Sequence, residues 1–132
     1  MDEVAALALC ERWLPLWTGN RPEALIEVYS EDAFYRDPAR PEGLRGRDEL
    51  LPYFRRLLAA NPSWVWSADA VFPISGGFTL RWKARIPVGA AVVEETGLDL
   101  VLVEQGLVTR NEVYFDRTAL FAAIAAQRGK QR

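Results

Sequence analysis

The spacing of apolar residues changes near the middle of the chain, and this change limits the fold more than any other feature. Up to residue 60 apolar side chains recur at a helical period, and from residue 63 they alternate with polar ones, as in strands that bury one face. The sequence therefore predicts helices followed by an antiparallel sheet. The inward-facing strand positions expected from the alternation are Trp64, Trp66, Ala68, Ala70, Phe72, Phe78, Leu80, Trp82, Ala84 and Ile86.

Capping and turn residues set the expected limits of the elements. Asp2 is expected to cap a helix that ends before Thr18 and Gly19, and Asn20 to cap a second helix that runs to about Tyr29. Residues 33–37 predict a short strand, 38–46 a loop, 47–60 a third helix, and 64–72 with 78–86 a hairpin. A second hairpin is expected over 92–104 and 107–115, before a closing helix to about residue 126. The whole predicts one α+β domain over residues 1–132, a cone-shaped curved antiparallel sheet wrapped around three N-terminal helices, with a short C-terminal helix.

The composition excludes several kinds of chemistry. Sixteen Lys and Arg against eighteen Asp and Glu leave a net charge of −2, so we expect neither a nucleic-acid nor a membrane partner. The chain has no His and Cys10 is its only cysteine, which rules out a Ser-His-Asp triad, a histidine or multi-cysteine zinc site and an internal disulfide. Acid-base work is left to carboxylates, Lys83, Lys130 or Tyr. The acidic start predicts no signal peptide, and a cytoplasmic location is expected.

Three carboxylates stand where a charge needs an explanation. Asp99 interrupts the apolar run 97–103, which reads as a central strand, and Asp37 and Asp116 end strands. Each also has a structural explanation: Asp37 before Pro38 makes an Asx-turn, and Asp116 caps the closing helix. For Asp99 the structural alternative is an ion pair with a neighbouring strand's arginine, which means one of Arg81, Arg85 or Arg110.

Aromatic residues are numerous and fall on faces expected to point inward. Trp13, Trp17, Trp64, Trp66 and Trp82 form a core in the simpler interpretation. Helices over a curved sheet also leave an interior that bulky side chains fill only partly. That interior is the default ligand pocket.

Three stretches of the sequence carry a family resemblance. They are residues 17–38, which end in Tyr35-Arg36-Asp37-Pro38, Gly46-Arg47 at a helix start, and residues 106–116. Together they resemble the SnoaL-like type of the nuclear transport factor 2-like superfamily. This superfamily includes ketosteroid isomerases, polyketide cyclases and limonene epoxide hydrolases. The resemblance covers nearly the whole chain and implies a homodimer formed through the outer face of the sheet.

Within this superfamily the ketosteroid isomerases are similar at two acidic positions. Their general-base Asp corresponds to Asp37, and their second Asp, which donates a hydrogen bond to an enolate oxygen in its acid form, falls at or within one residue of Asp99. Trp13 stands where they have a hydrogen-bonding Tyr, and Phe54 where they have a supporting helix Tyr, so the oxyanion site is incomplete. Asn111, in phase with Phe115, can supply a polar contact to the pocket.

These observations favour binding of a small hydrophobic molecule, with an isomerase or cyclase reaction in which Asp37 takes a proton and Asp99 stabilises the enolate. No metal and no organic cofactor is required. One alternative is a binding protein of the same fold without chemistry. Another is epoxide hydrolysis through a set that includes Asp116, although Lys83 replaces the acid that the hydrolases need on that strand. The expected substrate contacts are Trp13, Trp17, Phe54, Trp64, Trp66, Trp82, Asn111 and Phe115.

Overall fold

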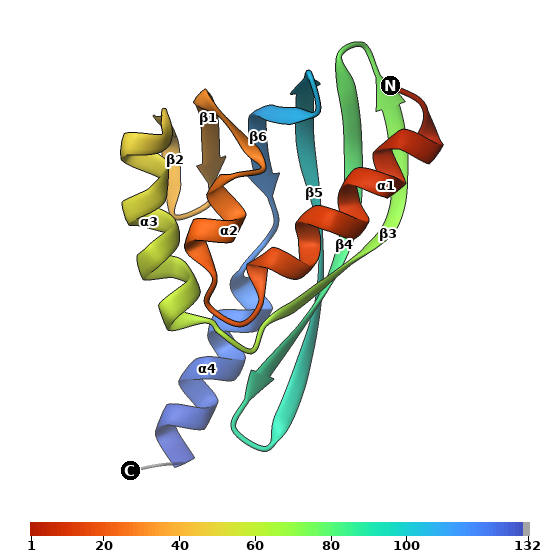
Figure 1. The fold of residues 1–132 in the computed structure, drawn as a ribbon. Helices are drawn as coiled ribbons and strands as arrows, with labels where there is room; N and C mark the ends of the chain where they lie inside the picture. Colours follow the sequence, from red (N-terminus) through yellow and green to blue (C-terminus); the bar gives the residue numbers. More distant parts are fainter. Residues whose placement is uncertain (131–132) are drawn as a thin grey trace.

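Six strands form one curved, unclosed sheet in the order β2-β1-β6-β5-β4-β3, and the first three helices lie across one of its faces (Figure 1). The computed structural model describes residues 1–130. Its helical elements are α1 (Glu3–Trp13), the 3₁₀ turn η1 (Leu14–Trp17), α2 (Pro22–Ile26), α3 (Arg47–Ala60) and α4 (Thr118–Lys130). Its strands are β1 (Tyr29–Asp37), β2 (Arg40–Arg45), β3 (Val65–Ile74), β4 (Gly77–Val88), β5 (Ala91–Glu104) and β6 (Leu107–Tyr114). The predicted α+β class is confirmed, and so is the predicted order of elements apart from the additional strand β2.

Strand pairing joins the first half of the chain to the second half, because β1 lies beside β6 in the sheet. Strands β3 to β6 form the expected antiparallel meander, but β1 pairs with β6 in parallel, with Tyr35 opposite Asn111. The sheet is therefore mixed rather than wholly antiparallel. This parallel pair places Asp37, at the end of β1, beside the end of β6.

The stretch after Asp37 is a strand, where the sequence predicted a loop. Its residues pair antiparallel with β1 as the edge strand β2. Gly43 makes this pairing possible, because it has a φ of +82° and a Cβ there would lie 2.2 Å from the Phe34 ring. Pro and Gly hid the strand in the sequence, since both are usually taken as loop signals.

The predicted cap of α1 and the predicted limits of α3 are confirmed, but the predicted cap of α2 is wrong. The Ala5 N–H donates to Asp2 Oδ1 at 2.8 Å, so the predicted cap of α1 is confirmed, as are the limits of α3 at 47–60. Asn20 does not cap α2. It adopts a φ of +55° in the preceding turn, and the helix ends at Ile26 because Tyr29 already belongs to β1.

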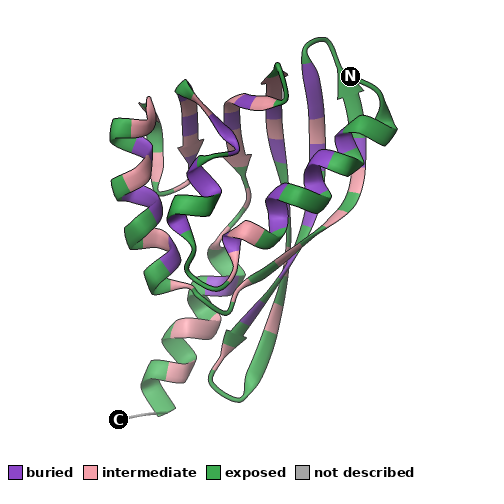
Figure 2. Ribbon diagram, viewed as in Figure 1, coloured by how far each residue is buried: buried purple, intermediate pink, exposed green. Residues whose placement is uncertain are grey.

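The core lies between the helices and the sheet, where buried positions face each other (Figure 2). The five inward positions predicted on β4 are all buried. On β3 a bulge between Ala68 and Ala70 shifts the alternation by one residue. Val71 is therefore buried, and Phe72, predicted to face inward, is 47% exposed.

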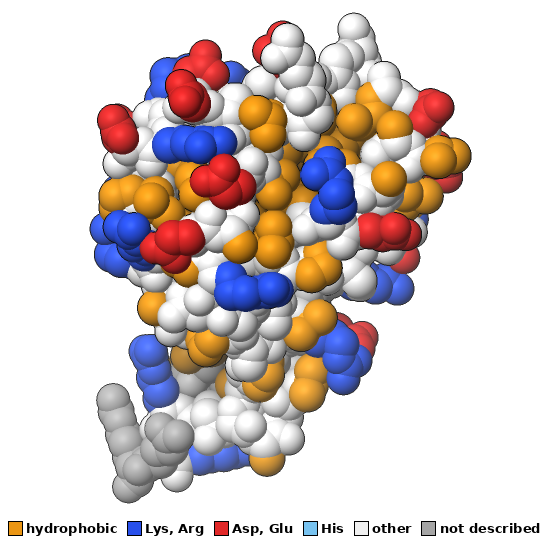
Figure 3. Space-filling view, viewed as in Figure 1, with side chains coloured by type: hydrophobic (Ala, Val, Ile, Leu, Met, Phe, Trp, Pro, Cys, Tyr) orange, Lys and Arg blue, Asp and Glu red, His pale blue; other side chains and the backbone are white. Residues whose placement is uncertain are grey.

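Helix α4 follows β6 and packs against β4 and β5 at the lower end of the sheet in Figure 1. Leu120 is its buried residue. No helix within residues 1–130 is long and apolar enough to cross a lipid bilayer. On the helix-covered face acidic and basic side chains are interspersed (Figure 3).

Candidate functional site

A cavity of about 320 Å³ lies where η1, α3 and α4 meet strands β3 to β6. Its wall is mainly apolar, and both singled-out carboxylates, Asp37 and Asp99, contribute to it. The structure therefore brings together two acids that are far apart in the sequence. Of the predicted contacts, Trp17, Trp64, Trp66, Trp82 and Phe115 also line the cavity.

The other three predicted contacts are fully buried and lie outside the cavity wall. Phe54 packs against Trp17 with ring centroids 5.3 Å apart, and Trp13 does so at 6.4 Å. Asn111 reaches the cavity only through Asp99, to which its amide donates a hydrogen bond. The spacing of residues in a sequence shows that a side chain points inward, but not whether it lines a cavity or packs against other side chains. This is why the sequence predicts these three residues as substrate contacts.

Asp99 is a buried carboxyl held by neutral donors. Trp82 Nε1 donates to its Oδ1 at 2.8 Å and Asn111 Nδ2 to its Oδ2 at 3.0 Å, and the residue is 5% exposed. Burial raises the pKa of Asp99 to about 7, because loss of hydration disfavours the charged form more than the two hydrogen bonds favour it; the nearby charge of Asp37 adds to the rise.

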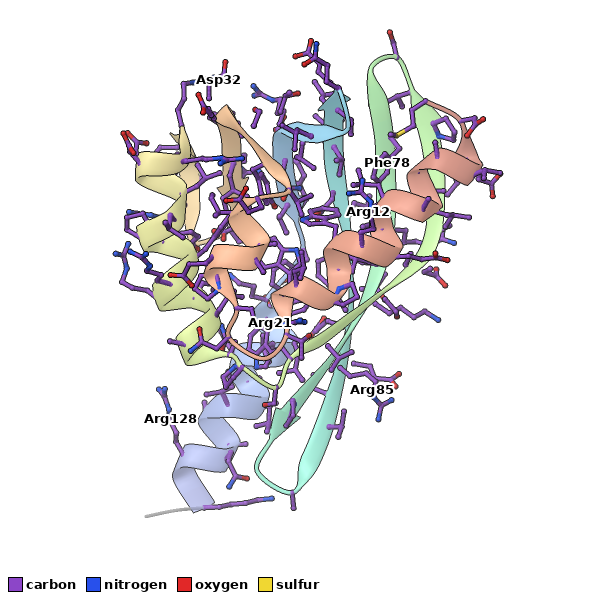
Figure 4. The ribbon with its side chains drawn as sticks, viewed as in Figure 1. Arg12, Arg21, Asp32, Phe78, Arg85 and Arg128 are labelled. Carbon is purple, nitrogen blue, oxygen red and sulfur yellow. The ribbon has the colours of Figure 1, made fainter. Side chains whose placement is uncertain are left out.

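The alternative explanation of Asp99, an ion pair with a strand arginine, is not what the structure shows. Arg81 pairs with Asp69, Arg85 with Glu94 and Arg110 with Glu112. These arginines lie on the opposite face of the sheet, and the side chain of Arg85 points away from the molecule (Figure 4). Asp99 thus has a hydrophobic setting without a cation.

The position of the Trp82 indole depends on a glycine. A Cβ on Gly97, which is opposite Trp82 in the β4–β5 pair, would lie 2.2 Å from the indole ring. Only a residue without a side chain leaves room for the ring there. Gly97 therefore positions the donor that binds Asp99.

A buried chain of hydrogen bonds continues behind Asp99. Trp13 Nε1 donates to Tyr29 Oη at 3.3 Å, and the Tyr29 hydroxyl donates to Asn111 Oδ1 at 2.9 Å. The indole N–H is only a donor, so the chain runs in one direction and turns the amide N–H₂ of Asn111 toward Asp99.

Asp37 is held very differently, by hydrogen bonds to both of its oxygens. Tyr35 and Tyr53 hydroxyls donate to Oδ2 at 2.8 and 2.6 Å, and the N–H groups of Ala39 and Arg40 donate to Oδ1, both at 2.9 Å. The predicted Asx-turn is therefore present, and the same carboxylate also faces the cavity. A carboxylate has about four acceptor sites, so these donors occupy all of them.

Three polar residues of the cavity wall were missed by sequence reasoning, namely Tyr53, Asn61 and Arg117. Tyr53 binds Asp37 from α3, and burial with the neighbouring Asp37 raises the pKa of its hydroxyl well above the usual range, so it stays protonated. Arg117 enters the cavity wall from the start of α4. Tyr53 precedes the Phe54 that was matched to the family's helix Tyr, so testing the adjacent residue would have found it. Arg117 gave no signal besides its charge.

The remaining candidates for chemistry lie elsewhere. Lys83 is exposed and pairs with Asp69. The Oδ1 of Asp116 accepts the N–H of Thr118, the first residue of α4, but the position directly before the helix is taken by Arg117. Burial raises the pKa of the Cys10 thiol to about 12, so it stays protonated. Within the described part of the chain no three His, Cys, Asp or Glu side chains are grouped to hold a metal ion.

The SnoaL-like domain family matches residues 10–111. The chain belongs to this family. Among solved structures this SnoaL-like protein is similar to a hypothetical protein with a ketosteroid isomerase-like fold from Catenulispora acidiphila, in complex with trimethylamine, at 18% identity and a TM-score of 0.76, covering 89% of this chain and 92% of the other. No curated protein shows a significant match to the sequence.

Two further structures carry the same fold with different names. A putative SnoaL-like polyketide cyclase from Jannaschia sp. CCS1 has 13% identity and a TM-score of 0.76 and covers 94% of both chains. An LEH-like epoxide hydrolase from Mycobacterium tuberculosis has 14% identity and a TM-score of 0.74, covering 96% of this chain and 94% of that one. At these identities the likeness concerns the fold, which hosts several activities.

Proposed function

We propose that this SnoaL-like protein binds a small hydrophobic molecule in the cavity and transfers a proton at a carbon next to a carbonyl group, as an isomerase or cyclase. The proposal rests on one observation: Asp99, a buried carboxyl without an ion-pair partner, forms part of a mainly apolar cavity wall. A side chain whose pKa lies near the working pH is suited to general acid-base catalysis. The cavity needs no metal or organic cofactor for this chemistry.

The acid form of Asp99 has no hydrogen-bond acceptor among the two side chains bound to its carboxyl oxygens. Trp82 Nε1 and Asn111 Nδ2 both donate, so neither can accept a hydrogen bond from the acid form. The acid O–H is therefore free for a ligand oxygen, where it would stabilise a developing enolate. The ring walls of Trp64 and Trp66 exclude water from such a ligand.

Asp37 is proposed as the base that removes the carbon-bound proton. All its acceptor sites are occupied, so it must first lose one hydrogen bond. The donor that can leave is the Tyr53 hydroxyl, because Tyr53 lines the cavity. A ligand carbonyl that takes this hydroxyl would free Oδ2 for the proton.

A second candidate, ligand binding without chemistry, is favoured by the same four hydrogen bonds on Asp37. If they persist when the cavity is filled, no base is available. Epoxide hydrolysis has less support, since Arg81 and Lys83 of the corresponding strand face away from the cavity and pair with Asp69.

Exchange of α-protons tests the two candidates. With 2-tetralone and 2-indanone in D₂O, proton NMR measures ketone binding by line shifts and catalysis by loss of the α-proton signal above the buffer rate. We expect exchange in the wild type and an exchange rate about 100-fold lower in Asp37→Asn and Asp99→Asn. Asp48→Asn, a control at an exposed site, should exchange at the wild-type rate. Binding without exchange supports the second candidate. If the ketones neither bind nor exchange, both candidates are overturned.

We also propose a homodimer through the outer face of the sheet. Leu98 and Tyr114 are paired neighbours on β5 and β6 on this face and are 46% and 48% exposed. Sedimentation equilibrium of the wild type and of Leu98→Asp tests it, with a dimer expected for the first and a monomer for the second. A monomeric wild type at about 100 μM would contradict the proposal. The cytoplasmic location expected from the sequence stays a prediction.

A further inference from the structure

We propose that the ligand of the cavity carries an anionic oxygen group, a carboxylate or sulfonate, and that Arg117 binds this group. The proposal deepens the ligand-binding function and rests on it, but it does not require the proton transfer. It is carried by the position of Arg117 and by the hydrogen-bond donors that this residue leaves free.

Arg117 is the one basic side chain of the cavity wall within residues 1–130. It lies between the end of β6 and the start of α4, where the lower end of the sheet meets the last helix in Figure 1. Its guanidinium donates to the Pro38 carbonyl at 3.3 Å and lies 4.8 Å from the ring centroid of Phe121. Pro38 and Phe121 also line the cavity, so the guanidinium is fixed at the cavity wall by two contacts.

The guanidinium has more donors than the protein uses. Arginine carries five N–H donors in a planar arrangement, and the hydrogen bond to Pro38 uses one of them. No carboxylate lies within 4.0 Å of Arg117 in the described chain, although seven other basic side chains there have such a partner. A cation in a mostly apolar wall, with free donors, is suited to an anion from outside the chain.

The nearby carboxylate of Asp37 does not account for this charge. Its oxygens already accept hydrogen bonds from two tyrosine hydroxyls and two backbone N–H groups, and none of these comes from Arg117. The positive charge of Arg117 also favours ionisation of the Tyr53 hydroxyl, although burial and Asp37 outweigh it and the pKa of Tyr53 stays high. Arg117 therefore acts on the same part of the cavity as Tyr53.

The proposed ligand class follows from the two parts of the cavity wall, one lined by tryptophan side chains and the other by Arg117. The apolar part of the ligand packs against the tryptophan side chains, and its anionic group faces Arg117. A guanidinium binds a carboxylate or sulfonate through two parallel N–H···O bonds, which a neutral carbonyl cannot match. Arg117 would thus select acidic members among apolar ligands of similar shape.

Two fluorescent dyes of nearly the same shape provide the test. 8-Anilinonaphthalene-1-sulfonate carries a sulfonate, and N-phenyl-1-naphthylamine is its neutral counterpart; both fluoresce when they leave water. We expect the wild type to bind the sulfonate at least tenfold more tightly than the neutral dye, and each dye to displace the other. Arg117→Gln should weaken binding of the sulfonate about tenfold and leave binding of the neutral dye within twofold.

Arg128→Gln is the matched control, because Arg128 is on the same helix, is exposed and points away from the sheet (Figure 4). It changes the net charge equally and should leave both affinities unchanged. Ala84→Leu fills part of the cavity and should weaken both dyes, with circular dichroism showing that each variant folds.

The outcomes separate the two proposals. If neither dye binds, the proposed ligand binding fails. If both bind in the cavity with equal affinity, or if Arg117→Gln weakens both equally because it only anchors α4, the anion selectivity fails and ligand binding stands. Sulfonate binding that survives Ala84→Leu, or that Arg128→Gln weakens as much as Arg117→Gln does, would place the dye on the surface and overturn the role of Arg117.

Discussion

Replacing Asp99 by Asn should change how the stability of the protein depends on pH. The pKa of Asp99 is raised from 3.8 to about 7 by burial. A carboxyl with a raised pKa in the folded state binds its proton more tightly there than in the unfolded chain. The contribution of Asp99 to folding stability is therefore highest below pH 4, falls as the pH rises toward 7, and is level above that, where both states are ionised.

The magnitude follows from the two pKa values. Each pH unit between them changes the free energy of unfolding by about 1.4 kcal/mol, so between pH 5 and pH 7 the wild type should lose about 2 kcal/mol through this residue alone. Asn has one acceptor oxygen for two donors, Trp82 and Asn111. At pH 5, where Asp99 of the wild type is protonated, the variant should be about 1–3 kcal/mol less stable than the wild type, because one donor is left unpaired.

Urea unfolding at pH 5, 6, 7 and 8 measures both effects. The variant should be less stable than the wild type at pH 5, and the difference should shrink by about 2 kcal/mol by pH 8, a relative shift of about 1 M in the urea midpoint. Asp48→Asn, at an exposed site, should leave the difference from wild type constant. A difference for Asp99→Asn that stays constant, or grows as the pH rises, would refute the burial of an uncompensated acid.

Three further outcomes are expected. Gly97→Ala should destabilise the protein by about 2–3 kcal/mol in urea unfolding, because a methyl group at that position collides with the Trp82 ring and moves its indole. Tyr53→Phe should cost about 1–2 kcal/mol in the same assay, because Asp37 loses one of the two hydroxyl donors to Oδ2. Cys10 should react with a disulfide reagent at least 100-fold more slowly in the native protein than in 6 M guanidinium chloride, because it is buried and protonated.

Controls for these substitutions are available in the chain. Gly129→Ala, in open space on α4, should be neutral within about 0.5 kcal/mol, and so should Ser63→Ala, which removes an exposed hydroxyl. If the controls lose as much free energy of unfolding as the test variants, the losses reflect a general sensitivity to substitution and not the contacts named. Rapid modification of Cys10 in the native state would show that its surroundings open easily.

The sequence predicted those parts of the fold that depend on local pattern. The helix over 47–60, the Asp2 cap and the buried face of β4 follow from periodicity and capping chemistry, and the structure has all three. The exposed position of Phe72 was not predictable in this way. A single extra residue at the bulge near Ala68 reverses the face of every later side chain, and composition gives no sign of it.

The candidate site was predicted in part. Asp99 was noticeable because a charge in an apolar strand is costly, and Asp37 because of its place before Pro38, and both line the cavity. The roles of the Tyr53 hydroxyl and the Arg117 guanidinium were missed, since both depend on long-range contacts with residues 37 and 38. The helical neighbours of a candidate residue are thus worth the same attention as the residue itself.

The most direct test is a carbon-13 NMR titration of the Asp99 carboxyl in the folded protein, with the signal assigned through Asp99→Asn. We predict a midpoint at about pH 7, and a higher one when N-phenyl-1-naphthylamine fills the cavity, because the neutral dye removes the remaining water. A midpoint at or below the ordinary value of an aspartate, or one that the dye does not move, would contradict the claim that this acid belongs to an apolar ligand cavity.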